Sequence, residues 1–375
     1  MEVLTNDNIK NAVILWYDDD DEAYETYGDI SEWDVSAVTD MSHLFFELID
    51  FNDDISRWDV SNVTDMSSMF DCATSFDQDI SYWNVSNVTD MSSMFDGATS
   101  FDQDISYWDV SNVKSMSYMF NGATSFNQPI GLWNVSNVTN MCSMFRQTDS
   151  FNQDINTGIV YENEGTYYAW DVSNVVNMSS MFSESKVFDK PIDNWNVSNV
   201  LDMSEMFCYA YSFNQNINTK TVTTQNGNTY YAWDVSNVEK MNYMFSWAQR
   251  FNKSLNDWNV SKVTNMKGMF ERAVVFNQNL NNWDVSNVKN MSLMFCCAQL
   301  FNESLSKWNV SNVEDMSYMF FNAESFNEDI SNWNVSNVTN KKKMFFNDES
   351  FNKDISNCDF SNITDERMYE VLMVL

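Results

Sequence analysis

Residues 55–76 read ISRWDVSNVTDMSSMFDCATSF, and close variants of this stretch recur along almost the whole chain. Tryptophan is the clearest marker: it recurs from Trp33 to Trp333 in steps of 25 residues, apart from one step of 37 and one of 38. Cys358 continues the series, so the 375 residues contain about thirteen copies. A fixed period of this length is the signature of stacked repeats. The sequence therefore predicts one repeat domain, although the length alone suggests two or three globular domains.

Each copy has two apolar patterns. Around Trp58 the pattern has the spacing of a leucine-rich repeat, and Trp58-Asp59-Val60 alternates as a short strand with one buried face does. The second pattern has the helical spacing i, i+3, i+4, i+7 and comprises Met66, Met69, Phe70 and Ala73. We therefore expect an α/β repeat fold. It would be a right-handed, leucine-rich-repeat-like solenoid of about 13 coils, each a short strand plus a short helix, with helical caps.

Small polar residues also recur in fixed columns. The column of Ser61 is serine in all thirteen copies, and the column of Asn62 is asparagine in eleven. Such columns predict hydrogen-bonded ladders that run from coil to coil. A calcium-binding row at the column of Asp59 is the alternative, but that column accepts Asn freely and lacks a glycine-rich calcium signature. We expect no metal and no cofactor.

The repeat carries a family resemblance. Phe76 to Phe95 reads FDQDISYWNVSNVTDMSSMF, and this unit resembles the BspA-like leucine-rich-repeat proteins, first grouped as a Mycoplasma family of unknown function. The resemblance covers roughly residues 28–362. Proteins of this kind are found among bacterial surface lipoproteins and adhesins, in protists and in large DNA viruses. The resemblance implies a surface or interaction protein without catalysis.

The ends of the chain depart from the repeat. Residues 1–28 predict an acidic capping helix over the first coil, residues 29–362 the solenoid, and residues 363–375 a C-terminal capping helix. The N-terminal end is strongly charged, since residues 1–54 hold 16 acidic residues and one basic residue. We interpret this charge as a solvated cap that keeps copies from stacking end to end. The alternative is a docking patch for a basic partner.

Two insertions, at residues 156–169 and 218–232, account for the two long steps in the tryptophan series. Both have β-branched and aromatic residues around a glycine turn, and Asn226-Gly227 is a strong hairpin signal. We predict two hairpin flaps that enter at the same position of the repeat and pack together. Their exposed tyrosines would form a binding surface made of Tyr161, Tyr167, Tyr168, Tyr230 and Tyr231. The alternative is a decoration that only covers the edge of the coils.

The column that precedes the tryptophans varies from copy to copy. Tyr82, Tyr107 and Leu132 occupy it on three consecutive coils, so we expect an apolar stripe that binds a partner. No catalytic constellation accompanies it. The chain has one histidine, His43, and its carboxylates recur by repeat position instead of converging. We expect no catalytic residues and no enzyme activity.

Charge and hydropathy exclude other classes of protein. A formal net charge of −34 argues against a nucleic-acid partner, because such binding needs clustered lysine and arginine. No segment has the length of a transmembrane helix, and no conventional signal peptide is recognisable, so we expect no membrane insertion. Sequons such as Asn62-Val-Thr64 lie inside the expected ladders, which disfavours a eukaryotic secretory route. A cytosolic, virion-associated or non-classically exported protein fits better.

These observations favour a non-catalytic repeat scaffold that mediates protein–protein interaction or surface adhesion through the solenoid face and the two flaps. Its partner would be a protein or a host surface, and we expect a monomer. One alternative is a structural component of a particle, such as a giant-virus virion. An adhesin with a hidden anchor and an enzyme of an unrecognised type are the others.

Overall fold

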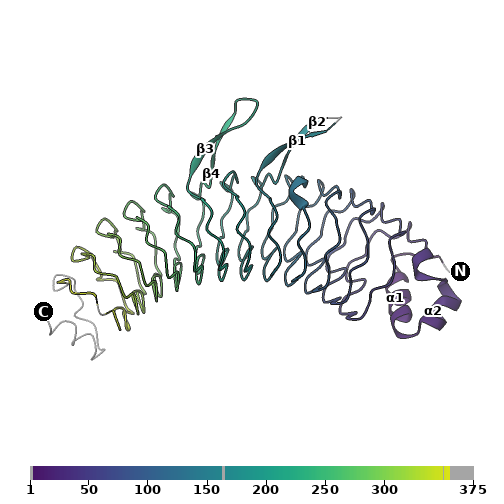
Figure 1. Cartoon of the computed structure of the whole chain (residues 1–375), viewed down its shortest axis with the longest axis horizontal. Coiled ribbons are helices and arrows are strands. Elements are labelled where there is room, and N and C mark those ends of the chain that lie inside the picture. Colours follow the sequence, from purple (N-terminus) through teal and green to yellow (C-terminus); the bar gives the residue numbers. More distant parts are fainter. Residues whose placement is uncertain (1–2, 163–164, 349, 355–375) are drawn as a thin grey trace. The chain divides into compact units, whose positions relative to one another are not determined.

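The computed structural model describes residues 3–162, 165–348 and 350–354. These residues form two compact units: unit 1 contains Met1–Val175 and Glu184–Lys190, and unit 2 contains Val176–Ser183 and Pro191–Leu375. Within each unit the repeats form successive coils that lie side by side (Figure 1). The coils are 25 residues long except at the two insertions, and the buried residues of each coil face those of the next.

Backbone hydrogen bonds join each coil to its neighbours. In unit 1, Thr64 N donates to Thr39 O at 2.9 Å, and Thr89 N donates to Thr64 O at 2.9 Å. Parallel β-bridges mark the same place, from Asp40↔Asp65 to Ser115↔Asn140 in unit 1 and from Asn177↔Asp202 to Asp315↔Asn340 in unit 2. The chain therefore forms a tandem-repeat structure in which backbone groups of one coil pair with those of the next.

The core of each unit consists of columns of identical residues. Phe45, Phe70, Phe95, Phe120 and Phe145 are stacked with ring centroids 5.2–5.8 Å apart. The tryptophans are buried beside them, and Trp108 donates its indole N–H to the carbonyl of Ile80 on the preceding coil at 3.1 Å. The excess of Met, Phe and Trp is thus a repeated core whose polar indole atoms are satisfied.

The predicted asparagine ladder is confirmed. The Nδ2 of Asn87 donates to Ser61 O, and the Nδ2 of Asn112 donates to Ser86 O, each at 2.7 Å. The serine column closes a turn within its own coil, since Ser61 N donates to the Asp59 carboxylate at 3.0 Å. The two polar columns therefore have different tasks: asparagine joins coils, and the aspartate–serine pair shapes one coil.

The short helix predicted in each coil is wrong for the coils that the structure describes. Along residues 66–72, the amides of Met66, Ser68, Phe70 and Cys72 donate to carbonyls of the next coil at 2.6–3.0 Å. Ser68 and Cys72 have positive φ values of 52° and 59°, which end any helical run. The physical reason is spacing, because a helix is about 10 Å wide and the phenylalanine rings of neighbouring coils are less than 6 Å apart. A series of tight turns occupies the segment instead.

The predicted strand is also displaced. Trp58 and Val60 are buried and Asp59 is exposed, as an alternating strand requires, but no ladder forms at these three residues. The backbone pairing lies further along the coil, at the bridge of Asp65. The alternation of apolar residues nevertheless predicted correctly which residues are buried. In this segment, as in a strand, successive side chains point to opposite sides of the backbone.

Two helices cover the first coil, where the sequence predicts one. They are α1 (Ile9–Asp18) and α2 (Asp20–Tyr27), and the Asp19 carboxylate caps α2 by accepting from Glu22 N at 3.1 Å. Before α1, the Oδ1 of Asn6 accepts hydrogen bonds from Thr39 N and Asp40 N. This side chain supplies the acceptor that a preceding coil would otherwise provide. The predicted C-terminal helix, residues 363–375, lies outside the described residues.

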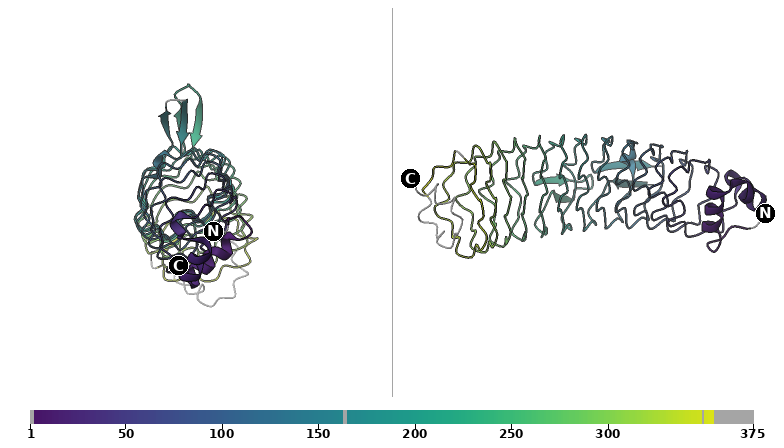
Figure 2. Two further views of the ribbon diagram at one scale, coloured as in Figure 1. Left: turned by 90° about the vertical axis from the view of Figure 1, so that its right-hand side faces the viewer. Right: turned by 90° about the horizontal axis from the view of Figure 1, so that it is seen from below.

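Each insertion forms an antiparallel hairpin. In unit 1, β1 (Gly158–Glu162) pairs with β2 (Gly165–Ala169), and in unit 2, β3 (Lys220–Thr223) pairs with β4 (Thr229–Ala232). Each hairpin projects beyond the coils from which it leaves (Figures 1 and 2). Two short 3-10 turns, Ile30–Glu32 and Ile130–Leu132, complete the regular elements of the described residues. Among those residues, neither helix has the length and apolar character that a membrane crossing requires.

Candidate interaction surface

Hydrogen bonds attach the hairpin of unit 1 to its coils at its base and on its second strand. The hydroxyl of Thr157, at the base of the hairpin, donates to the carbonyl of Trp170 at 2.7 Å. The hydroxyl of Tyr167 on β2 donates to the carbonyl of Leu132 on the preceding coil at 2.6 Å. Because one bond closes the base and the other ties the second strand to the stack, the hairpin has a defined direction relative to its coils.

The hairpin of unit 2 is attached in the same way. Thr219 donates to the carbonyl of Trp233 at 2.8 Å, and Tyr230 donates to the carbonyl of Asn194 at 2.5 Å. The equivalent residues in the two insertions therefore make equivalent bonds. An ion pair between Lys220 and Asp193 is a further attachment in unit 2. We define the two tyrosine bonds, Tyr167–Leu132 and Tyr230–Asn194, as the hairpin tethers.

The tethers divide the tyrosines predicted as binding residues into two groups. Tyr167 and Tyr230 are half-buried, and their hydroxyls contact backbone. Tyr161 and Tyr231 have exposed fractions of 67% and 62%. Tyr168 is half-buried and pairs with Ile159 on β1. Tyr161 and Tyr231 therefore provide most of the aromatic surface that the hairpins present to solvent.

The predicted stripe on the coils of unit 1 is exposed. The exposed fractions are 88% for Tyr82, 87% for Tyr107 and 56% for Leu132. Leu132 also provides the carbonyl of the first tether, so the stripe ends where the hairpin of unit 1 is attached. We define Tyr82, Tyr107, Leu132 and Tyr161 as the aromatic edge of unit 1. The structure thus connects two features that the sequence predicts separately.

The predicted packing of one hairpin on the other stays a prediction. The β1–β2 hairpin belongs to unit 1 and the β3–β4 hairpin to unit 2, and each is described within its own unit. Each of them alone offers an exposed tyrosine on a two-stranded sheet.

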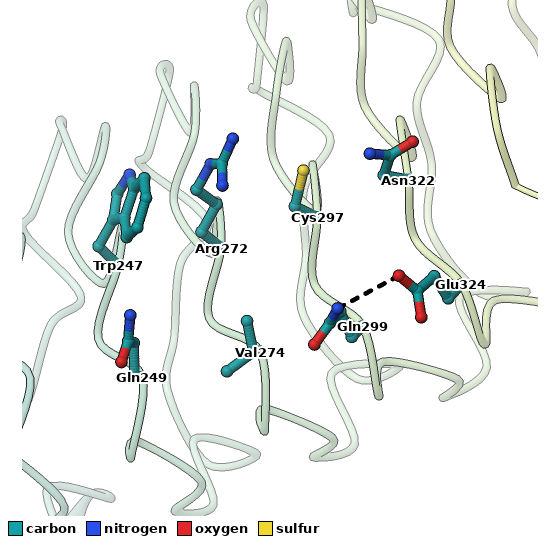
Figure 3. Close-up of a pocket in the computed structure, with 8 residues that line it drawn as sticks. All are labelled: Trp247, Gln249, Arg272, Val274, Cys297, Gln299, Asn322 and Glu324. Carbon is teal, nitrogen blue, oxygen red and sulfur yellow. Dashed lines mark hydrogen bonds between the residues drawn. The ribbon is translucent and has the colours of Figure 1, made fainter.

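Unit 2 has a further surface, which begins at the aromatic pair Tyr209 and Trp247 that the sequence places in one repeat column on neighbouring coils. Tyr209 and Trp247 are stacked with ring centroids 5.3 Å apart, and the guanidinium of Arg272 lies 4.5 Å from the centroid of Trp247. Cys297 and Asn322 continue this row on the next two coils, and together with Gln299 and Glu324 they line a groove (Figure 3). We call it the thiol groove. These residues occupy the same column of the repeat, and that is the sequence signal for the row. The signal predicts a groove only when it is known to which side of the coils this column points.

Electrostatics separate the two units. Residues 1–113 hold 26 acidic and two basic residues, whereas residues 239–310 hold five acidic and eight basic residues. In unit 1, burial raises the pKa of Asp96 to about 6, with the neighbouring Asp71 carboxylate adding to the effect and a hydrogen bond from Asn121 opposing it.

In residues 3–162, 165–348 and 350–354, no cluster of three or more His, Cys, Asp or Glu side chains is arranged to hold a metal ion.

Fold and surface together define a tandem-repeat protein. The family model described as "Mycoplasma protein of unknown function, DUF285" matches residues 19–116, 80–168, 161–232, 220–309 and 276–372. These five overlapping matches cover most of the chain, which therefore belongs to this family of unknown function. A search of the curated proteins and a search of the solved structures each gave no match.

Proposed function

We propose that this chain is a non-catalytic repeat scaffold that binds a protein or host-surface partner through the aromatic edge of unit 1 and the hairpin of unit 2. The observation that carries this proposal is the exposure of the aromatic edge. Tyr82 and Tyr107 place two nearly complete phenol rings in solvent on consecutive coils. Tyrosine is enriched at interfaces because it buries a large apolar area at a low entropic cost.

The attachment of the hairpins supports the same proposal. Each hairpin is fixed by hydrogen bonds to backbone carbonyls, so its exposed tyrosine is held in a defined direction before any partner arrives. A pre-organised contact loses less conformational entropy on binding than a mobile loop does. The two insertions have the same attachment bonds and each presents an exposed tyrosine. This repetition favours a binding role over the alternative, in which the hairpins only cover the edge of the coils.

The finer identity belongs to this proposal too. We infer a BspA-like protein with a right-handed leucine-rich-repeat-like solenoid, modified because its coils have turns where leucine-rich repeats have helices. Adhesion or protein binding would be its role, without catalysis. The acidic charge of residues 1–113 disfavours nucleic acid as the partner. We expect the chain to act as a monomer.

Deletion of the hairpins tests the proposal without disturbing the repeat. Removal of residues 157–168 shortens the step from Trp133 to Trp170 from 37 to 25 residues, and removal of residues 219–231 shortens the step from Trp195 to Trp233 from 38 to 25. Each variant thus keeps the ordinary repeat length. The full chain and each deletion would be used to capture and cross-link partners from candidate host-cell extracts and matrix.

A double variant, Tyr82→Ser with Tyr107→Ser, tests the stripe alone, and Leu300→Ser on unit 2 serves as the matched control for loss of an exposed apolar side chain. We expect captured partner to fall at least tenfold with the double variant and to stay unchanged with the control. Equal capture by all variants would contradict the proposal. Recovery of the chain at a fixed ratio in purified particles would instead support the structural-component alternative.

A further inference from the structure

Cys297 lines the thiol groove between Arg272 and Asn322, which occupy the same position on the adjacent coils (Figure 3). All three residues have positive φ values, from 54° to 57°, so they leave their coils in the same conformation. The guanidinium of Arg272 lies over the ring of Trp247. Arg272 N donates a hydrogen bond to Cys296 O, which joins the coil of Arg272 to the coil that carries Cys297. A half-exposed thiol thus has a cation on one side and an amide on the other.

A second thiol stands beside it. Cys296 is 6% exposed, and its sulfur lies 3.7 Å from that of Cys297. Because thiolates are costly to bury, Cys296 stays protonated and donates its S–H to Cys297. This hydrogen bond lowers the pKa of Cys297, burial opposes the shift, and the charge of Arg272 adds to it. Glu271 also faces the pair, and its charge opposes the lowered pKa of Cys297.

We propose that Cys297 is a modification site that forms a mixed disulfide with a small thiol bearing carboxylates, of the glutathione class. Arg272 would receive a carboxylate of that thiol. The Asn322 amide lines the groove as a donor and acceptor for its peptide groups, and the Glu324 carboxylate, which accepts a hydrogen bond from Gln299 Nε2 at 3.2 Å, suits its ammonium group. The groove therefore offers partners for each kind of polar group on such a tripeptide.

The reaction is thiol–disulfide exchange with a low-molecular-weight disulfide as the oxidant. The Cys297 thiolate attacks one sulfur of that disulfide, a new S–S bond forms, and the original S–S bond breaks. The departing half leaves as a thiolate and takes a proton from solvent. Cys297 is oxidised, and the departing half is reduced.

A disulfide between Cys296 and Cys297 is the competing product, and geometry disfavours it. Adjacent residues have Cα atoms about 3.8 Å apart across a trans peptide, whereas disulfides usually join Cα atoms roughly 4.4–6.8 Å apart. Such a strained bond is more easily reduced. The mixed disulfide on Cys297 is therefore the product that persists, and Cys296 is a positioning residue that holds the thiolate.

The chain contains its own control. Cys72 occupies the same repeat column as Cys297 and has a similar φ, 59° against 57°. In unit 1, however, burial and the carboxylates of Asp71, Asp96 and Glu47 raise the pKa of Cys72 to about 11. Two thiols of the same backbone geometry thus have opposite electrostatic surroundings.

The test incubates the full-length chain with oxidised glutathione at pH 7 and locates the modified cysteines by non-reducing peptide mass mapping. We expect Cys297 to react at least about tenfold faster than Cys72, because its thiolate fraction is much larger. We also expect oxidised glutathione to react faster than cystamine, which is cationic. Arg272→Gln should remove this preference, and Cys296→Ala should move the pH profile of Cys297 upward. Equal rates at Cys72 and Cys297, or faster reaction with cystamine, would overturn the proposal.

Discussion

The hydroxyl of Tyr167 donates a 2.6 Å hydrogen bond to the backbone carbonyl of Leu132, and Tyr230 makes the equivalent bond to Asn194 at 2.5 Å. Both tyrosines lie three residues before the tryptophan of their coil, and both acceptors lie one residue before the tryptophan of the preceding coil. These two equivalent hydrogen bonds show how the repeat accommodates a hairpin inserted at one of its positions. The insertion leaves the stack, forms a hairpin, and is tied to the column from which it departs.

Loss of a tether should loosen the hairpin without unfolding its coils. For Tyr230→Phe we expect a loss of about 1 kcal/mol of local stability, because one hydrogen bond is removed. Hydrogen exchange at Thr221–Thr223 should then become faster. The matched control is Tyr231→Phe, whose ring is on the exposed side of the same strand. If both variants kept the same amide protection, the tether would have no structural role.

Neighbouring aromatic residues should differ sharply in their contribution to stability. Trp108 is 4% exposed and Tyr107 is 87% exposed. We expect Trp108→Ala to lower the free energy of unfolding by roughly 3–5 kcal/mol through the cavity it leaves. Tyr107→Ala should change it by less than about 0.5 kcal/mol.

Urea unfolding followed by circular dichroism would measure both changes. Because repeat arrays can unfold in parts, hydrogen exchange should also localise the loss to the coils around Trp108. A large loss of stability in Tyr107→Ala would show that the stripe is part of the core, and this would argue against its use as a binding surface.

Asp96 should make unit 1 less stable as the pH rises. Its folded pKa, about 6, is above the ordinary value of 3.8, so the folded state binds the proton more tightly than the unfolded state. The stabilisation is fully present below about pH 4 and is lost as the pH rises through 6. Asp96→Asn should therefore be more stable than the parent protein at pH 8, where the Asp96 carboxylate of the parent is charged.

Thermal unfolding of both proteins at pH 5 and pH 8 would test this expectation. The variant should gain stability relative to the parent at pH 8 and roughly half as much at pH 5. Asp59→Asn is the contrasting control, because the hydrogen bonds from Ser61 lower the pKa of Asp59 and its contribution is lost in acid. The same pH response in both variants would exclude Asp96 as the cause.

The turns that replace the predicted helices carry backbone strain that can be relieved. Glu205 has a φ of 58°, a region that asparagine enters more easily than glutamate. We expect Glu205→Asn to raise the free energy of unfolding by roughly 1 kcal/mol. Glu239→Asn, at an exposed position without positive φ, removes the same charge and should give no such gain. Equal effects in denaturant unfolding would assign the change to charge instead.

The sequence by itself determined the period, the columns that are buried, the asparagine ladder and the places of the insertions. Each of these depends on which side of the coil a residue faces, and a strict period reports that directly. The sequence also predicts a helix at Met66, Met69, Phe70 and Ala73, because these apolar residues have helical spacing. Only the tertiary structure decided against it, since rings stacked less than 6 Å apart leave no room for a helix about 10 Å wide.

The same division holds for the candidate sites. Tyr82, Tyr107 and Leu132 could be found from their column alone, because exposure follows from repeat position. The tether of Tyr167 and the row of Trp247, Arg272 and Cys297 could not. They depend on the direction in which side chains leave turns of positive φ and on which coils a hairpin contacts. Those directions are set by hydrogen bonds between coils, and so by residues about 25 positions apart.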